Sequence, residues 1–228
     1  MNLFKQNIVI CKTCDKLDDV LGRFKNSGLP EPVVFDGSIQ SNLSNIYQYA
    51  TDNKLTYVTI FSSDAYPCKN ILEKFDELES LIPKDWDILS WCRRGEVSGW
   101  HPANLNHLWS CGYGEIIGPR ISPSIKSIND KFISIDAYTF GDDCFTIKTE
   151  VIPLFLDIVN YYGVLDICLS SAPYEGFINV YHSKELLVCK FAENKWYFPL
   201  NYNDKSNQYR CGFYNRHGSD IPPIDFQI

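Results

Sequence analysis

The strongest constraint on the fold of this chain is the alternation, over its first half, of short apolar runs with helical patterns. The run Tyr57-Val58-Thr59-Ile60-Phe61 is almost continuously apolar, which is typical of a strand covered on both faces. This order predicts an α/β fold of three layers, in which helices cover both faces of a mostly parallel central sheet. Strands are expected at residues 7–10, 32–35, 57–61 and 87–91. Helices are expected at residues 16–25, in the segment that follows a capping Ser44, and at residues 69–81.

The second half of the chain is less regular. Strands are expected at residues 144–147, 177–181 and 186–189, with a helix at residues 150–161. Residues 92–136 combine Gly, Pro, Trp and His with little periodicity, which predicts a long, structured surface excursion of the kind that often serves a function. No linker or repeat divides the chain, so residues 1–228 are expected to form a single domain.

Charge and composition exclude several classes of partner. The net charge of -7 argues against general binding to nucleic acid, which depends on neutralising phosphates with Lys and Arg. The longest apolar stretches are too short to span a bilayer, and the polar start predicts no signal peptide. Nine scattered cysteines in such a chain are most simply free thiols, so we expect a cytoplasmic protein without an integral membrane segment.

In parallel α/β sheets, ligands bind at the carboxyl ends of the strands. This rule places residues 11–14, Asp36, residues 62–64 and the segment after Trp91 along one crevice. Asp64 closes the buried third strand, where a rigidly held carboxylate can bind a hard divalent cation. Such a cation would bridge the phosphates of a sugar nucleotide and stabilise the leaving diphosphate. The alternative is that Asp64 only caps the following turn.

The order of segments resembles glycosyltransferase family 25, the group of lipopolysaccharide and collagen galactosyltransferases with GT-A-like (Rossmann-like) catalytic domains. The resemblance spans about residues 7–190. The matching segments are Asp15-Lys16, Phe35-Asp36-Gly37, Ser62-Ser63-Asp64-Ala65, Trp86-Asp87-Ile88-Leu89, residues 141–145 and Leu165-Asp166-Ile167. The resemblance implies a glycosyltransferase (hexosyltransferase) that moves a sugar from a nucleotide diphosphate sugar to a glycan or other hydroxyl acceptor. By the same resemblance, the donor is a UDP-sugar and the configuration at the anomeric carbon is inverted.

The chain departs from the family at the metal-binding motif. The family's third strand ends in Glu-Asp-Asp-Ala, whereas this chain has Ser62-Ser63-Asp64-Ala65 and keeps only the last carboxylate. A manganese or magnesium ion could be held by Asp64 with the diphosphate and water, or be absent. By resemblance to GT-A enzymes, His182 could complete the metal shell; the alternative is an ordinary surface histidine.

Three carboxylates are candidates for the base that deprotonates the acceptor hydroxyl. Asp142 and Asp143 are neighbours, and mutual repulsion would raise one pKa if both faced a desolvated cleft. The alternative for this pair is a solvated turn. Asp166 stands at the family's position, with helix capping or a surface turn as its alternative.

The predicted substrate sites follow from these placements. The nucleotide is expected near Lys16 and Asp36, and the diphosphate near Ser62, Ser63 and Asp64. Arg93-Arg94 could also pair with phosphate oxygens. An acceptor glycan is expected beneath the loop of residues 100–113, where Trp109 could stack on a sugar ring.

Two other functions remain open from the sequence. A catalytically impaired sugar-binding or scaffold protein of the same fold would explain the loss of acids at Ser62-Ser63. A thiol-disulfide redox protein is suggested by Cys11-Lys12-Thr13-Cys14, because a thiol at a helix N-terminus has a lowered pKa.

Overall fold

The computed structural model describes residues 3–5, 8–12, 17–92, 95–96, 124–136, 139–140, 143–163, 165, 168–169, 176, 178–197 and 219–226. Within them an eight-stranded sheet runs in the order β2-β1-β3-β10-β5-β11-β8-β7. Two strands of this sheet, β10 and β8, run opposite to the other six. The strands are β1 (Ile8–Lys12), β2 (Val33–Asp36), β3 (Tyr57–Ser62), β5 (Ile88–Ser90), β7 (Ser124–Ser127), β8 (Phe132–Asp136), β10 (Cys144–Lys148) and β11 (Val180–Ser183).

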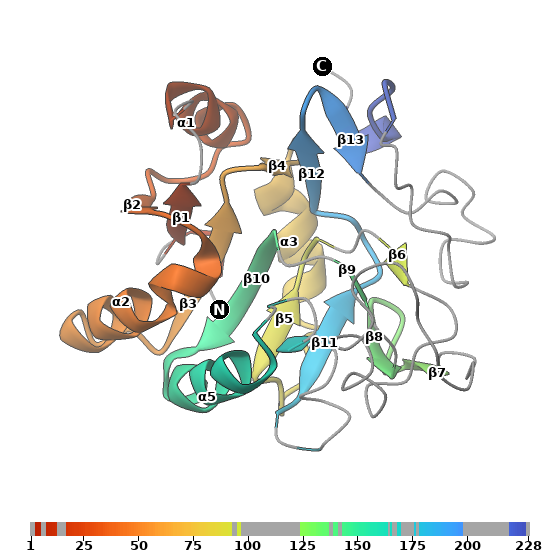
Figure 1. The fold of residues 1–228 in the computed structure, drawn as a ribbon. Coiled ribbons are helices and arrows are strands. Elements are labelled where there is room, and N and C mark those ends of the chain that lie inside the picture. The colour runs from red at the N-terminus through yellow and green to blue at the C-terminus, as the bar shows by residue number, and fades with distance from the viewer. Residues whose placement is uncertain are drawn as a thin grey trace, which may run out of the picture.

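Helices cover both faces of this sheet (Figure 1). One face packs against α1 (Leu17–Asn26) and α3 (Ile71–Glu79), and the other against α2 (Ile39–Asp52) and α5 (Ile152–Tyr162). Each helix buries an apolar stripe, as Val20 and Phe24 of α1 do one turn apart. The predicted α/β fold of three layers with a mostly parallel sheet is therefore confirmed.

The helix boundaries have local causes. Helix α2 begins after Ser38, whose side chain accepts a hydrogen bond from the backbone N–H of Ser41 over 3.1 Å. The predicted cap, Ser44, is wrong: this residue lies exposed inside the helix. Helix α5 follows a short 3-10 turn, η3 (Thr149–Val151), and ends at Gly163, whose φ of 77° suits the left-handed end of a helix.

A chain of buried hydrogen bonds joins the N-terminal segment to the middle of the sheet. Trp91 donates its indole hydrogen to the hydroxyl oxygen of Thr146 over 2.8 Å. The hydroxyls of Thr146 and Thr59 lie 2.9 Å apart, and Thr59 donates to the carbonyl of Leu3 over 2.6 Å. Because Thr59 gives its only hydroxyl hydrogen to Leu3, Thr146 must donate to Thr59. This chain of hydrogen bonds gives partners to the buried polar side chains where β3 and β10 pair.

A second sheet of three strands lies beyond the carboxyl end of β3, in the order β13-β12-β4. Its strands are β4 (Ala65–Pro67), β12 (Val188–Ala192) and β13 (Lys195–Tyr197). The rings of Tyr66, Phe191 and Trp196 pack against one another with centroids 4.6 to 6.1 Å apart. The 3-10 helix η4 (Ile224–Phe226) joins this cluster through Phe226, whose ring centroid lies 6.2 Å from that of Trp196. Aromatic packing therefore holds the strands of this small sheet and η4 together.

The predicted surface excursion at residues 92–136 is wrong in its last part. Residues 124–136 contain β7 and β8, which pair with each other and extend the main sheet beyond β11. Two short strands, β6 (Gly95–Glu96) and β9 (Thr139–Phe140), pair separately. Residues 97–123 lie outside the described part of the chain. No helix among the described residues is long and apolar enough to cross a membrane.

Candidate functional site

The candidate site lies where β3 ends at the carboxyl edge of the main sheet. The backbone N–H of Ser62 donates to the carbonyl of Asp143 over 2.8 Å, and that of Ser63 donates to the carbonyl of Cys11 over 3.1 Å. Because β10 runs antiparallel to β3, the residue that precedes β10, Asp143, lies at the same edge of the main sheet as the end of β3. The two predicted sites around Asp64 and Asp143 are therefore brought together, although they are far apart in the sequence.

Asp143 is a buried carboxylate, only 3% exposed. Ser62 donates its hydroxyl hydrogen to Oδ1 of Asp143 over 3.0 Å, and the thiol of Cys92 lies 3.9 Å from Oδ2. A buried carboxylate is stable in its charged form only when hydrogen bonds and opposite charge compensate it. These contacts match that requirement and leave Asp143 firmly oriented.

Lys190 supplies the opposite charge. Its Nζ lies 3.5 Å from Oδ1 of Asp143 and 3.4 Å from Oδ2 of Asp64. Strand β12 brings the lysine here by pairing with β4, in a register that puts Lys190 opposite Ala65. The backbone N–H of Phe191 also donates to the carbonyl of Asp64 over 2.8 Å. Ser62, Asp64, Asp143 and Lys190 are hereafter called the carboxyl-edge cluster.

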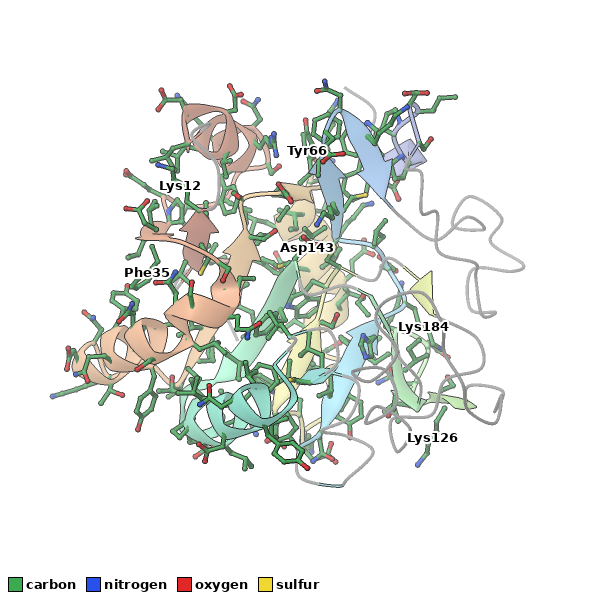
Figure 2. The ribbon with its side chains drawn as sticks, viewed as in Figure 1. Lys12, Phe35, Tyr66, Lys126, Asp143 and Lys184 are labelled. Atoms are coloured by element: carbon green, nitrogen blue, oxygen red, sulfur yellow. The ribbon has the colours of Figure 1, made fainter. Side chains whose placement is uncertain are left out.

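The members of the cluster differ in their exposure to solvent. The side chains of Asp64 and Lys190 are 36% and 23% exposed, whereas that of Asp143 is 3% exposed. Figure 2 shows Asp143 at the upper end of β10, with Tyr66 above it at the small sheet. A ligand approaching this edge would therefore meet Asp64 and the ammonium of Lys190 before it met Asp143.

Lys190 was not predicted from the sequence. The signal that could have found it is a single charged residue inside the apolar run of residues 186–191, since an ammonium there requires a compensating carboxylate. The partner could not be named in advance, because the pairing of β12 with β4 is long-range.

A second pair of charges lies at the same edge of the sheet. Asp36 ends β2 and Lys12 ends β1, and their register makes them direct neighbours. Lys12 Nζ lies 3.7 Å from Oδ1 of Asp36, whose side chain is 89% exposed. Such an exposed ion pair contributes little to stability. Lys12 therefore adds a cation at the same edge of the sheet, on the strand next to β3 (Figure 2).

Several predicted residues lie outside the described part of the chain. They are the substrate-binding Lys16 and Trp109, the base candidates Asp142 and Asp166, and the phosphate-binding candidates Arg93 and Arg94. Of the predicted residues that the structure describes, Ser62, Asp64 and Asp143 come together, Ser63 is buried next to them, and Asp36 stands two strands away on β2.

His182 does not join Asp64. It is 3% exposed and lies on β11, where it pairs with Ser90 of β5 and Ile133 of β8. Strands β10 and β5 separate β11 from β3. At a spacing of about 4.8 Å between neighbouring strands, three steps across the sheet amount to roughly 14 Å. That separation is too large for both side chains to bind one ion, and His182 is a buried residue, not a surface histidine.

The described residues at this edge do not fit a resident divalent cation. No group of three or more His, Cys, Asp or Glu side chains in the described part of the chain is arranged to hold a metal. The two carboxylates of the carboxyl-edge cluster already face an ammonium, and the Ser62 hydroxyl is turned towards Asp143 as a donor. A hard cation needs oxygen ligands that are free to turn their lone pairs to it.

The thiol of Cys11 does not have the chemistry of a redox cysteine. It is fully buried on β1, and burial raises its pKa from the ordinary value of 9.0 to about 12. A nucleophilic cysteine needs a lowered pKa and access to solvent. Cys14, the other member of the Cys-x-x-Cys motif, lies outside the described residues. The properties of Cys11 speak against the redox hypothesis.

A separate hollow of about 700 Å³ lies at the opposite edge of the sheet, between the start of β3 and the end of β10. Its lining includes Trp86 and Lys148. The ammonium of Lys148 lies 5.3 Å from the centre of the Trp86 ring and 3.4 Å from Oδ1 of Asp87. Asp87 also accepts a hydrogen bond from the backbone N–H of Asn179. These contacts tie strand ends together and are adequately explained as structural.

No protein-family model matches this chain, and no curated protein matches it significantly. The structure resembles that of protein A197 from STIV, with 12% identity and a TM-score of 0.43 over 82% of this chain and 86% of that one. It also resembles the inositol-1-phosphate CTP transferase from T. maritima, with 15% identity and a TM-score of 0.35 over 77% and 66%. A third similar structure is mouse xyloside xylosyltransferase 1, with 12% identity and a TM-score of 0.34 over 72% and 57%. Likeness at this level does not identify a reaction, so the function rests on the chemistry of the carboxyl-edge cluster.

Proposed function

We propose that this protein transfers a sugar from a nucleoside diphosphate sugar to a hydroxyl acceptor at the carboxyl-edge cluster. The supporting observation is the convergence of Ser62, Asp64, Asp143 and Lys190 at the carboxyl end of the central strand β3. Ligands of parallel α/β sheets bind at this edge. The family resemblance of the sequence favours a uridine nucleotide as the donor.

The reaction is a displacement at the anomeric carbon. The acceptor oxygen forms a bond to this carbon while the bond from the carbon to the diphosphate oxygen breaks, and its electron pair leaves with the nucleoside diphosphate. The hydroxyl proton passes to a carboxylate base. Attack from the side opposite the diphosphate inverts the anomeric configuration.

Of the three base candidates, Asp142, Asp143 and Asp166, only Asp143 lies in the described part of the chain. Asp143 is buried, and its Oδ1 already accepts from Ser62 and faces Lys190, so its geometry suits a positioning residue that orients these two groups. Asp166 keeps the role that the family resemblance implies, and we propose it as the base. Asp64, which is the more exposed carboxylate, is placed to meet the donor beside Lys190.

Departure of the diphosphate requires positive charge at this edge, because negative charge grows on the leaving oxygen. Lys190 and Lys12 are two of the described cations at this edge. Their pairing with Asp64, Asp143 and Asp36 holds them at the edge before a donor arrives. Preorganised charge of this kind stabilises a transition state without a cost of reorientation.

The alternative of a sugar-nucleotide-binding protein without turnover is favoured by one observation. Ser62 and Ser63 stand where the resembling family has carboxylates, and Ser62 serves to hold Asp143. The two functions share the same binding site and differ only in whether the bound donor is consumed.

A panel of nucleoside diphosphate sugars tests the proposal. The donor should raise the melting temperature, because a ligand bound only by the folded state stabilises it. Incubation of that donor with acceptor glycans should release the nucleoside diphosphate and form a glycoside of inverted configuration, measurable by NMR. Binding without release supports the alternative, and the absence of binding across the whole panel refutes both.

A further inference from the structure

We propose that Lys190 provides, in this chain, the positive charge that a divalent cation provides in metal-dependent transferases, so that nucleoside diphosphates bind without metal. The inference rests on the proposed function and deepens it. The ligand of Lys190 is the diphosphate group of the donor. The experiment below separates its failure from failure of the proposed function.

The position of the ammonium is the first argument. Lys190 Nζ lies 3.4 Å from Oδ2 of Asp64 and 3.5 Å from Oδ1 of Asp143, so it faces both carboxylates of the cluster. Two carboxylates at the end of a central strand are the ligands that a bridging metal ion would use. A dication bound by both would lie within a few ångströms of the ammonium, where like charges repel strongly in a partly buried site.

The local sequence gives a second argument. The two residues that precede Asp64 are serines, which supply no negative charge to an ion, and the hydroxyl of Ser62 donates to Asp143. Asp64 and Asp143 are the only carboxylates of the cluster. Each of the two serines, Ser62 and Ser63, stands where the resembling family has an acid, and each therefore removes one negative charge. The ammonium of Lys190 offsets one of the two negative charges that remain.

The rigidity of the lysine is a third argument. Lys190 stands in the middle of β12, which is hydrogen-bonded to β4 on one side and β13 on the other. The neighbouring Phe191 packs with Tyr66 and Trp196 on these strands. A lysine side chain ordinarily loses considerable rotamer entropy on binding an anion. Here two carboxylates and a paired strand fix it beforehand, while 23% of its side chain stays exposed to a ligand.

Calorimetry with uridine diphosphate, in EDTA and in manganese chloride, tests the inference. The variants are Lys190→Met, which keeps the aliphatic stem, and Lys190→Arg, which keeps the charge. Lys195→Met is the matched control, because Lys195 lies on the adjoining strand β13 and pairs with the exposed Asp220. The melting temperature of each variant reports whether it is folded.

The wild-type protein should bind uridine diphosphate equally well in EDTA and in manganese. Lys190→Met should weaken binding in EDTA by about tenfold, the change that corresponds to 1.4 kcal/mol, while Lys190→Arg and Lys195→Met should stay within about threefold of the wild type. Manganese should restore part of the binding of Lys190→Met, because the two carboxylates have then lost their ammonium.

Two results would overturn the inference while leaving the proposed function in place. One is a wild-type protein that binds uridine diphosphate only with manganese. The other is a folded Lys190→Met variant that binds in EDTA as the wild type does. If uridine, guanosine, cytidine and adenosine diphosphates all fail to bind the wild type under both conditions, the proposed function itself fails, and the inference with it.

Discussion

The ammonium of Lys190 lies 3.5 Å from Oδ1 of Asp143, a carboxylate that is only 3% exposed. The two residues come from different sheets, β12 of the small sheet and the residue before β10 of the main sheet. Their contact is therefore an electrostatic link between the two sheets, made at the point where we place the diphosphate.

A double-mutant cycle should show that this link stabilises the fold. Asp143→Asn and Lys190→Met should each lower the free energy of unfolding by about 1 to 3 kcal/mol, less than the 3–5 kcal/mol of a fully buried pair because Lys190 is partly exposed. The double variant should lose less than the sum, since neither charge is then left without its partner. Urea denaturation of the four proteins measures the coupling, and strict additivity would show that the two charges do not interact.

Asp64 should matter for turnover and little for stability. Its side chain is 36% exposed, and the hydrogen bond from Phe191 reaches its backbone carbonyl, which a substitution leaves intact. Asp64→Ala should lower kcat/KM with the identified donor by at least about tenfold, a loss of 1.4 kcal/mol in transition-state stabilisation.

The matched control for Asp64 is Asp76→Ala. Asp76 is an exposed aspartate of α3 that pairs with Lys5 over 2.9 Å and is not a member of the cluster. This variant should keep wild-type activity and a similar melting temperature. Equal activity of Asp64→Ala and Asp76→Ala would remove Asp64 from the site.

The local part of the fold could be predicted from the sequence. Strands β1, β2 and β3 and the helices between them appeared within one or two residues of their observed bounds, except for the start of α2. Each of these elements has its own apolar pattern, and consecutive strands joined by a helix normally lie parallel in one sheet. Asp64 at the carboxyl edge followed from that rule alone.

The insertion of β10 between β3 and β5 could not be predicted in this way. Its apolar pattern identifies a strand but gives neither its direction nor its neighbours. The register is fixed by long-range contacts such as the Ser62 to Asp143 backbone hydrogen bond and the Thr59 to Thr146 hydroxyl pair. The meeting of Asp143 with Ser62, and of Lys190 with both aspartates, depends on pairings between segments distant in the sequence.

The hydroxyl of Thr146 should be important for stability, because it accepts from Trp91 and donates to Thr59 at a fully buried position. Thr146→Val keeps the shape but leaves the indole N–H of Trp91 without an acceptor, which should cost about 1 to 3 kcal/mol. Thr51→Val is the control: this threonine also donates a hydrogen bond, but on the exposed side of α2, and its loss should cost about 0.5 kcal/mol or less. If the urea midpoint falls no further for Thr146→Val than for Thr51→Val, the buried hydrogen bonds of Thr146 do not stabilise the fold.

The buried thiol of Cys11 should make the protein less stable in alkali. Its pKa rises from 9.0 to about 12 on burial, so above pH 9 the unfolded chain loses this proton while the folded chain keeps it. The unfolded state then binds fewer protons, and the free energy of unfolding falls with rising pH until the folded thiol also ionises near pH 12. Each such thiol should contribute a slope of up to about 1.4 kcal/mol per pH unit.

Comparison with Cys11→Ala isolates this contribution, because all other groups that titrate between pH 9 and 12 are common to both proteins. Urea denaturation at several pH values should give a steeper decline for the wild type than for Cys11→Ala, and a thiol reagent at pH 7 should leave Cys11 unmodified until the protein unfolds. Parallel declines, with rapid modification of Cys11 in the folded protein, would mean that the thiolate is accessible. In that case the Cys-x-x-Cys segment would regain the nucleophile that a redox function requires, since such a function depends on a thiolate formed near neutral pH.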